Sequence, residues 1–568
     1  MQKKSSFKHN KRKNMVLLRL PQTLLTVALA LGSGLALAAS AETAPPNILL
    51  IVADDLGYSD LGSYGGEIST PTLDQLARDG LQFTNMYAAP TCSITRSMLM
   101  SGTDNHLVGL GTMAEALQPF QRGKPGYEGF LNPRAYSIAE LLKKGGYSTS
   151  MVGKWHLGLE PDQGPDQRGF EQSFTLLEGG ASHFKPSTVE PAKIEQVHYR
   201  ENGKAVTLPE DFYSSDFYTD KLISYLQNSK KAGKPFFAYA AYTSPHWPLQ
   251  APREYLDKYQ GRFDQGYDSV RMARIERMKK LGLMASDGQP AQPIPVNPKL
   301  PGWQQLSPEQ QRVEARKMEI YAAMVDNLDH NIGRLIEYLR QSGQYDNTLI
   351  VFMSDNGAAG ENHTQFYPPG THTDNSYANL GRPGSQIDYG LRWAEVSAAP
   401  FHLFKGTTAE GGISVPAIIR LPGTLQRQGV ERGVARVDDL APTFLQLAKI
   451  AVPEEAPSDT SKHPITGLSM LPMLAGKGSP HSHDNLAGEL FGNAYYREGD
   501  LKLLGMRPQA GFGESPQPLQ WQLFDISKDR GETTDLAAAQ PETLQRLKAA
   551  WLKYAHQVGV VFAGPENR

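Results

Sequence analysis

Four apolar runs without polar alternation predict that a buried β-sheet lies at the centre of this chain. They are residues 47–53 (NILLIVA), 235–242 (PFFAYAAY), 348–353 (TLIVFM) and 415–421 (VPAIIRL). Continuous runs of β-branched and aromatic residues are typical of strands that are covered on both faces, as in a mostly parallel sheet.

Helical patterns lie between these runs. Each begins at a capping residue or a proline, or repeats its apolar residues every three to four positions. The predicted helices are residues 70–79, 137–144, 314–341 and 438–449. Strands that alternate with helices predict an α/β fold: a large, mostly parallel sheet flanked by helices.

The C-terminal part of the chain has a different pattern. Residues 452–463 (VPEEAPSDTSKH) have the composition of a linker, and residues 464–568 follow with a predicted hairpin at 494–505 and a terminal helix at 541–557. We therefore predict a large α/β domain over 45–451 and a smaller α+β domain with an antiparallel sheet over 464–568.

Within the larger predicted domain, residues 252–315 are charged and proline-rich. The stretch QPAQPIPVNPKLP cannot form regular structure, since proline removes a backbone donor and fixes φ. We interpret 252–315 as a long insertion near the mouth of the functional site. Residues 181–186 and 377–402 are also expected to shape a pocket, with Tyr389 and Trp393 suited to an aryl group.

The N-terminus has the order of a secretory signal. A basic stretch precedes an apolar segment at 23–38, and small residues suited to cleavage follow near positions 38 and 41. We predict a signal peptide over 1–41, export to the periplasm or the medium, and no stable membrane insertion after cleavage. An uncleaved membrane anchor is the alternative, although the apolar segment is short for a span.

The composition of the chain excludes some classes of function. The chain has 568 residues, 40% of them hydrophobic, and a net charge of −2. Without a basic surface, nucleic-acid binding is not expected. The single cysteine, Cys92, excludes an intramolecular disulfide in an exported protein. A lone cysteine is usually a small buried hydrophobe, but the neighbours of Cys92 favour chemistry instead.

Two of the apolar runs end in acidic pairs. The first continues into Asp54-Asp55 and the third into Asp355-Asn356, and a glycine follows closely in both cases. In α/β sheets, ligands collect outside the carboxyl ends of the strands. Carboxylates brought together there repel one another unless they hold a cation, and oxygen ligands favour Ca²⁺ or Mg²⁺ over zinc. The alternative is that each pair is only a turn signal.

Cys92 begins a predicted helix that Gly102 closes. A nucleophile at that position lies near a helix N-terminus, where backbone N–H groups favour anions. Arg96 is four residues further on and shares its face of the helix. A cationic neighbour also lowers the pKa of a thiol.

Four more side chains are candidates for anion binding and proton transfer. Lys154 and His156 would point the same way if the chain is extended there, and His246 follows a buried run. Lys405 precedes the loop that leads into the last apolar run. Each of these residues alone is equally consistent with a structural or surface role.

Taken in order, these motifs resemble the type I sulfatases of the alkaline phosphatase superfamily, most closely the bacterial arylsulfatases. The shared order is Asp-Asp-x-Gly, Cys-Ser-x-Thr-Arg-Ser, Gly-Lys-Trp-His, Ser-Pro-His, Ser-Asp-Asn-Gly and Lys-Gly, and it covers nearly all of the mature chain. The resemblance implies an alkaline-phosphatase-like sandwich and the hydrolysis of sulfate monoesters, with aryl sulfates as the expected substrates.

The resemblance also implies a role for each residue. A formylglycine-generating enzyme acting on the unfolded chain would convert Cys92 into formylglycine, and Arg96 would hold the hydrate of that aldehyde. Lys154 and Lys405 would bind the sulfate oxygens, His156 would take a proton from the hydrate, and His246 would protonate the leaving group. The implied calcium ligands are Asp54, Asp55, Cys92 in its converted form, Asp355 and Asn356.

One position departs from the family pattern. Ile94 stands where the motif has proline, and less often alanine, so the efficiency of the cysteine conversion is in question. We expect residue 94 in a first helical turn that tolerates either residue. Two alternative functions stay open: a phosphonate monoester or phosphodiester hydrolase of the same superfamily, and a non-catalytic protein that binds sulfate esters with Cys92 unconverted.

Overall fold

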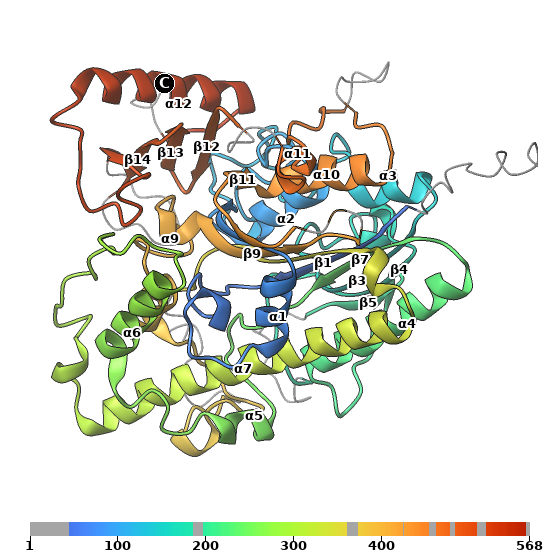
Figure 1. Ribbon diagram of the computed structural model, residues 1–568, viewed down its shortest axis with the longest axis horizontal. Coiled ribbons are helices and arrows are strands. Elements are labelled where there is room, and N and C mark those ends of the chain that lie inside the picture. The colour runs from blue at the N-terminus through green and yellow to red at the C-terminus, as the bar shows by residue number, and fades with distance from the viewer. Residues whose placement is uncertain are drawn as a thin grey trace, which may run out of the picture. The chain divides into compact units, whose positions relative to one another are not determined.

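The predicted strands form a sheet in the computed structural model (Figure 1). The structure describes residues 45–185, 197–360, 373–423, 425, 427–453, 462–477, 483–507 and 518–563. The predicted signal peptide and most of the predicted linker lie outside these residues. Residues Pro45–Arg568 form one unit. Among the helices that the structure describes, none has the length and apolar character to cross a bilayer.

Within the described residues, the main sheet has eleven strands in the order β10-β2-β9-β8-β1-β7-β3-β4-β5-β6, with β11 beside β2. Its centre, β8-β1-β7-β3-β4, is parallel, whereas β9 pairs antiparallel with both β8 and β2. The strands are β1 (Asn47–Ala53), β2 (Leu81–Tyr87), β3 (Ser148–Lys154), β4 (Gln172–Leu176), β5 (Tyr199–Glu201), β6 (Lys204–Ala205), β7 (Phe236–Ala241), β8 (Thr348–Ser354), β9 (Ser414–Arg420), β10 (Gly429–Glu431) and β11 (Ala435–Arg436). The predicted mostly parallel sheet is confirmed.

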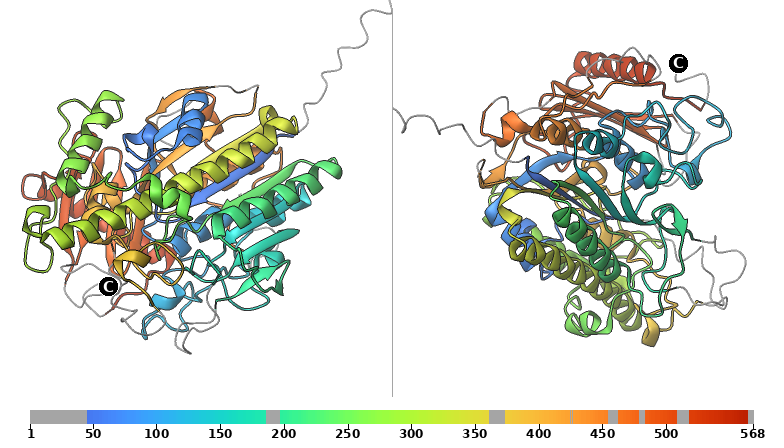
Figure 2. Two further views of the ribbon diagram at one scale, coloured as in Figure 1. Left: turned by 90° about the horizontal axis from the view of Figure 1, so that it is seen from below. Right: turned by 90° about the vertical axis from the view of Figure 1, so that its right-hand side faces the viewer.

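Helices cover both faces of this sheet, which is why the strands β1, β7, β8 and β9 are buried along their whole length. In β1, Leu49 and Ile51 pack into a core with α1, α4 and α7, and the alternate residues Ile48 and Leu50 pack into a second core with α2, α3 and α10. Figure 2 shows α4 and α7 side by side on the first face. The helices are α1 (Pro71–Asp79), α2 (Cys92–Ser101), α3 (Ile138–Lys144), α4 (Ser214–Lys231), α5 (Arg253–Lys258), α6 (Gly266–Lys280), α7 (Pro308–Gln341), α8 (Gly390–Ser397), α9 (Glu410–Ile413), α10 (Leu440–Leu447), α11 (Leu471–Leu474) and α12 (Pro541–Val558).

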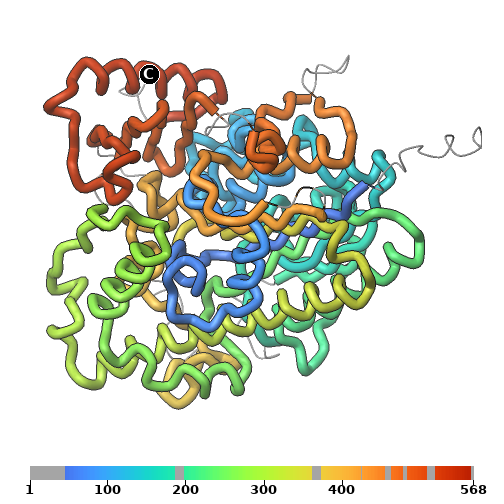
Figure 3. The backbone as a smooth tube through the Cα atoms, viewed as in Figure 1, coloured from blue at the N-terminus to red at the C-terminus, as the bar shows by residue number. Residues whose placement is uncertain are grey.

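The segment interpreted as an insertion is built into the protein core. It contains α5 and α6, while residues 289–301 form no helix or longer strand, as their prolines predict. Figure 3 traces it in green before α7 begins. Arg274 of α6 is fully buried and forms ion pairs with Asp60 and Glu67, just beyond the end of β1. The segment therefore supports the loop that carries Asp54 and Asp55.

The C-terminal part carries a second, antiparallel sheet, as predicted. Its strands are β12 (Asn485–Leu490), β13 (Asn493–Glu498), β14 (Leu501–Met506) and β15 (Gln520–Asp525), in that order. The predicted hairpin is β13–β14, and α12 packs on this sheet with its own apolar cluster around Trp551. The domain boundary itself stays a prediction.

A buried histidine joins this C-terminal part to the region that follows α2. His106 lies 3.1 Å from Asp104 through Nδ1 and 3.1 Å from Glu489 of β12 through Nε2. Tyr554 of α12 donates a hydrogen bond of 2.8 Å to the second oxygen of Asp104. Burial alone would lower the pKa of His106, but its two carboxylate partners outweigh burial and raise it to about 9.

This raised pKa predicts a pH dependence of stability. The stabilisation by protonated His106 is complete below the unfolded-state pKa near ~6.5 and is lost as the pH rises through the folded-state value of about 9. We expect the free energy of unfolding to fall by on the order of 1–3 kcal/mol between these pH values. Chemical unfolding of His106→Gln should show a smaller slope than the wild type, in which the raised pKa of His156 also contributes, whereas His556→Gln, on the exposed side of α12, should keep the full slope. Equal slopes in wild type and His106→Gln would contradict the prediction.

Candidate active site

The two acidic pairs meet at the carboxyl ends of neighbouring parallel strands. Ala53 of β1 is paired with Ser354 of β8, so the residues that follow each strand emerge side by side. Asn356 donates a hydrogen bond of 2.7 Å to the carboxylate of Asp55, and the backbone N–H of Asp55 donates to Asp355 over 3.3 Å. Asp55 has a φ of +66°, which turns the chain sharply and brings both members of its pair to one site.

Helix α2 brings Cys92 to the same place. Cys92 is its first residue and is buried, and Gly102 ends the helix with a φ of +67°, as predicted. One turn along, Arg96 contacts Asp355 with Nη2–Oδ2 and Nε–Oδ2 distances of 2.7 and 3.0 Å. The guanidinium also donates to the backbone oxygen of Lys154 over 2.9 Å, which fixes its position.

Both predicted anion-binding lysines reach the site, but in the structure each contacts a carboxylate. Lys154 Nζ lies 2.8 Å from Asp54, and Lys405 Nζ lies 2.9 Å from Asp55. Together with Arg96, they balance the three carboxylates of the cluster. A divalent cation added to these residues would leave the site with a net positive charge suited to an anionic ligand.

The two histidines lie on different parts of the site. His246 Nε2 is 3.5 Å from Asp55, and its Nδ1 is 2.6 Å from the backbone oxygen of Trp247. The chain is not extended from Lys154 to His156, so the condition under which the two side chains would point the same way is not met. Strand β3 ends at Lys154, and His156 has a φ of +56°, so its ring turns towards Cys92 and Glu115 instead.

Unsatisfied atoms indicate where a cation would bind. Asp54 Oδ1 and Asn356 Oδ1 are buried and have no hydrogen-bond partner among the described residues. One ligand atom from each of Asp54, Cys92 and Asp355 lies within 4.8 Å of the others. Unpaired buried oxygens are costly, and a hard cation would satisfy them. Sulfur is a soft ligand, so converting Cys92 to a hydroxyl-bearing group would complete an all-oxygen set.

Electrostatics at the site follow from burial and close charges. Burial and the neighbouring Asp54 raise the pKa of Asp355 to about 6. Burial also raises the pKa of Asp55, but Lys405 and His246 outweigh it and the net shift is downward. The two lysines and the arginine therefore offset only part of the repulsion between the three carboxylates. A bound divalent ion would favour the charged form of all three carboxylates.

The pKa values of the two histidines move in opposite directions. Burial lowers the pKa of His246 well below its usual range. For His156, Glu115 and the Cys92 side chain outweigh burial and raise the pKa to about 9. Removal of the Cys92 thiol would lower the pKa of His156, and so would a cation bound nearby. Either change would bring this pKa closer to neutral pH, where a histidine acts best as a base.

Sequence reasoning missed Glu115 and two glycines. Glu115 Oε1 lies 2.9 Å from His156 Nε2. A Cβ on Gly179 would lie 2.6 Å from His156 Cε1, and a Cβ on Gly180 would lie 3.1 Å from His246 Cε1. These glycines therefore allow their loop to pass close to both histidines. Neither Glu115 nor the glycine pair belongs to a pattern that would have identified it in advance.

The expectation that Tyr389 and Trp393 suit an aryl group in a pocket is wrong, because both side chains are buried. The side chain of Trp393 is fully buried in an aromatic cluster with Phe263, Tyr267 and Trp303. Tyr389 stacks on Tyr321 with 4.6 Å between ring centroids and is also buried. Both side chains therefore have a structural role. Each aromatic ring buries a large apolar surface, and this burial stabilises the core around the site.

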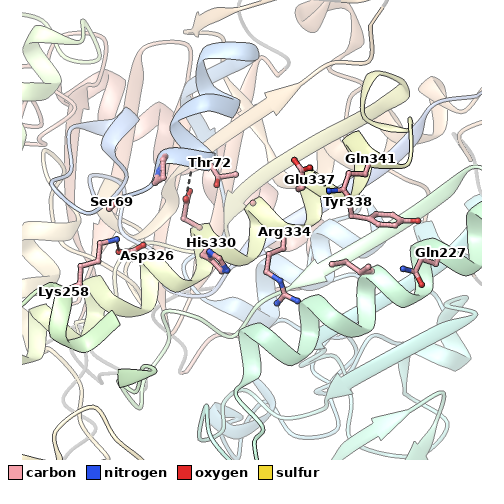
Figure 4. Close-up of a pocket in the computed structure, with 14 residues that line it drawn as sticks. Ser69, Thr72, Gln227, Lys258, Asp326, His330, Arg334, Glu337, Tyr338 and Gln341 are labelled. Atoms are coloured by element: carbon pink, nitrogen blue, oxygen red, sulfur yellow. Dashed lines mark hydrogen bonds and ion pairs between the residues drawn. The ribbon is translucent and has the colours of Figure 1, made fainter. Parts of the chain in front are cut away.

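A cavity of about 750 Å³ along α7 is separate from these residues (Figure 4). Its polar lining includes Lys258, Asp326, His330 and Arg334, and none of the predicted site residues contributes to it. Asp326 there pairs with Lys258 and accepts a hydrogen bond from Tyr259. The groove therefore does not share the chemistry of the acidic cluster.

Comparison with known proteins agrees with the geometry. The Sulfatase family model matches residues 46–450. An uncharacterized sulfatase of Schizosaccharomyces pombe is 43% identical over 547 residues, which is 92% of this chain and 96% of that protein. An arylsulfatase of Klebsiella aerogenes is 40% identical over 440 residues, covering 76% and 92%. The crystal structure of Ps i-CgsB superimposes with a TM-score of 0.63 at 26% identity, covering 90% and 93%.

Proposed function

The chain belongs to the sulfatase family and is a hydrolase of sulfuric esters, and we propose that it acts through a formylglycine made from Cys92 beside one calcium ion. Aryl sulfates are the proposed substrates, with inorganic sulfate and a phenol or alcohol as products. The observation that carries this proposal is that Asp54 and Asn356 each have an unsatisfied buried oxygen. Asp54 clusters with Cys92 and Asp355 and pairs with Arg96, and Asn356 is hydrogen-bonded to Asp55.

The proposed calcium ligands follow from the cluster. They are Asp54, Asp55, Asp355, Asn356 and the converted residue 92. When present, the formylglycine hydrate supplies one hydroxyl that attacks sulfur and a second whose deprotonation releases sulfate. With calcium bound, the ion would neutralise Asp54 and Asp55. The ammonium groups of Lys154 and Lys405, which contact these carboxylates in the structure, would then be able to contact the sulfate oxygens as well.

The remaining side chains hold and move protons. Arg96, fixed by Asp355 and the backbone of Lys154, would orient residue 92. His156 would accept a proton at Nδ1, which has no hydrogen-bond partner among the described residues. His246 donates its Nδ1–H to the Trp247 backbone oxygen, so Nε2 is the nitrogen left for the leaving group, and a proton on Nε2 would make the ring an imidazolium. Burial lowers the pKa of His246, so the negative charge of a bound ester would be needed to keep the ring protonated.

The acid role of His246 predicts a dependence on the leaving group. We expect His246→Ala to slow sulfate esters of poor leaving groups by ~10²–10⁴-fold and to affect p-nitrophenyl sulfate far less, because a good leaving group needs no proton. Rates across a series of substituted phenyl sulfates would measure this. His183→Gln is a suitable control, since His183 is buried next to His246 but contacts only its backbone oxygen. Equal losses across the series would remove His246 from the acid role.

The test of the proposed function is peptide mass at residue 92, measured on protein from the native host together with sulfate release. A mass showing formylglycine and sulfate release from an aryl sulfate are expected. Faster hydrolysis of an aryl phosphodiester or phosphonate monoester would favour the alternative hydrolase. A fully unconverted Cys92 with sulfate-ester binding but no turnover would favour the non-catalytic alternative.

We also propose that the chain is exported, to the periplasm or the medium, after cleavage near residue 41, and that a formylglycine-generating enzyme acts on it before it folds. The buried position of Cys92 supports the order of these steps, because the folded chain shields the thiol from a second enzyme. N-terminal sequencing of the protein from its host tests the cleavage.

A further inference from the structure

We propose that Glu115 is a positioning residue for His156: its carboxylate accepts the Nε2–H of the imidazole and so leaves the Nδ1 lone pair for residue 92. The base role of His156 that this assumes is part of the proposed function. Glu115 does not touch residue 92 in this arrangement, and its effect on the reaction passes through the ring it holds.

The contacts of His156 divide its two ring nitrogens between two partners. Nε2 lies 2.9 Å from Glu115 Oε1. Nδ1 is buried and has no hydrogen-bond partner among the described residues, and the side chain of Cys92 is a neighbour of the ring. Since Glu115 occupies Nε2, Nδ1 is the nitrogen that remains for residue 92.

This division fixes the tautomer. A neutral imidazole carries its hydrogen on one nitrogen and a lone pair on the other, and an ionised carboxylate can only accept. Glu115 therefore selects the form with hydrogen on Nε2. A base that takes a proton from a hydroxyl of residue 92 needs a lone pair on Nδ1, which is the form selected. The same logic explains why an acidic residue orients the histidine of hydrolytic triads.

The surrounding chain is shaped to allow this pair. A Cβ at Gly179 would lie 2.8 Å from His156 Nε2 and 3.1 Å from Glu115 Oε1, so only glycine leaves the space between them. The side chain of His156 is 8% exposed, whereas that of Glu115 is 52% exposed. The carboxylate thus reaches the buried ring from the solvent side, and its replacement should leave the core intact.

The first test reads the tautomer directly. The purified protein, labelled with ¹⁵N in its histidines, would be compared with Glu115→Ala, and the His156 signals would be assigned by their absence in His156→Gln. At a pH above the pKa of His156, where the imidazole is neutral, we expect a protonated Nε2 and an unprotonated Nδ1 in the wild type, and a mixture of tautomers in Glu115→Ala. An unchanged tautomer in Glu115→Ala would overturn the proposal, whether or not the protein has the proposed activity.

The second test separates positioning from a general structural defect. Because His156 acts after sulfur has been attacked, Glu115→Ala should lower kcat by ~10²-fold and lower KM in parallel, leaving kcat/KM nearly unchanged. Sulfate retained covalently on the protein during turnover, counted by intact mass after rapid quenching, should rise. Glu115→Gln should fall between wild type and Glu115→Ala, because it keeps an acceptor oxygen but no charge.

Two further variants complete the design. Gly179→Ala should resemble Glu115→Ala, since it separates the pair without removing the carboxylate. Glu128→Gln is the matched control, because Glu128 lies in the same stretch of chain and pairs with Arg134 instead of a site residue. Equal losses of kcat and kcat/KM in Glu115→Ala, or no loss at all, would contradict the positioning role. If wild type itself retained no sulfate and had no formylglycine, the proposed function would fail, and the tautomer would still be measured.

Discussion

Replacing Cys92 by alanine is expected to lower kcat/KM for an aryl sulfate by ~10⁴–10⁶-fold, the loss that follows removal of a covalent nucleophile. The remaining rate would come from Arg96, the lysines and the bound cation, which still attract and orient the ester. The fold should survive, because the change removes one sulfur atom from a buried helix start. Kinetics with p-nitrophenyl sulfate and a thermal unfolding curve measure the two effects.

The control for this prediction is Met98→Leu, a buried change of similar volume in the same helix, which should retain activity. Residual activity of Cys92→Ala within tenfold of the wild type would show that residue 92 is not the nucleophile. The reaction would then have to depend on another group of the cluster or on water held by the cation.

Replacing Asp355 by asparagine is expected to remove the calcium ion and lower kcat/KM by ~10³-fold or more, since the cation both neutralises charge and orients the attacking group. Asp355 is one of the three residues whose ligand atoms lie within 4.8 Å of one another, and it is also the partner of Arg96. Asparagine keeps the shape and can still accept from Arg96, so the loss should reflect the missing charge more than a collapse of the site.

Calcium per chain by elemental analysis and activity after chelation measure this effect. Chelation of the wild type should abolish turnover, and added Ca²⁺ should restore it. Asp326→Asn is the matched control, because this buried acid lies in the groove along α7, away from the cluster. Two zinc ions and no calcium in the wild type, or full calcium in Asp355→Asn, would contradict the proposed metal site.

The sequence by itself determined the strands of the central sheet and most of the residues that form the site. Runs such as 47–53 and 348–353 are apolar on both faces, a pattern that only a covered strand explains, and both end in acidic pairs. Because the carboxyl ends of parallel strands share one edge of a sheet, the strand pattern places Asp54, Asp55, Asp355 and Asn356 at the same edge, and their oxygen side chains favour a shared cation there. The helix that begins at Cys92 could also be predicted from local sequence, because Gly102 marks where it ends.

Tertiary structure alone decided which of these groups touch. That Lys154 contacts Asp54 and Lys405 contacts Asp55 depends on β1 lying between β8 and β7, and strand order is not encoded in any local pattern. Ile94 was expected only in a tolerant helical turn, but its side chain is 1% exposed and belongs to the core, because the sheet packs against that face of α2.

Glu115 is the clearest case of a residue that sequence could not identify. It lies 41 positions from His156, in a short turn with no motif, and its carboxylate is half exposed like many surface acids. Its contact with the ring arises where β3 ends and where the loop at Gly179 leaves room. Periodicity reports which face of an element is buried, whereas a hydrogen bond between two loops depends on how the whole chain brings them together.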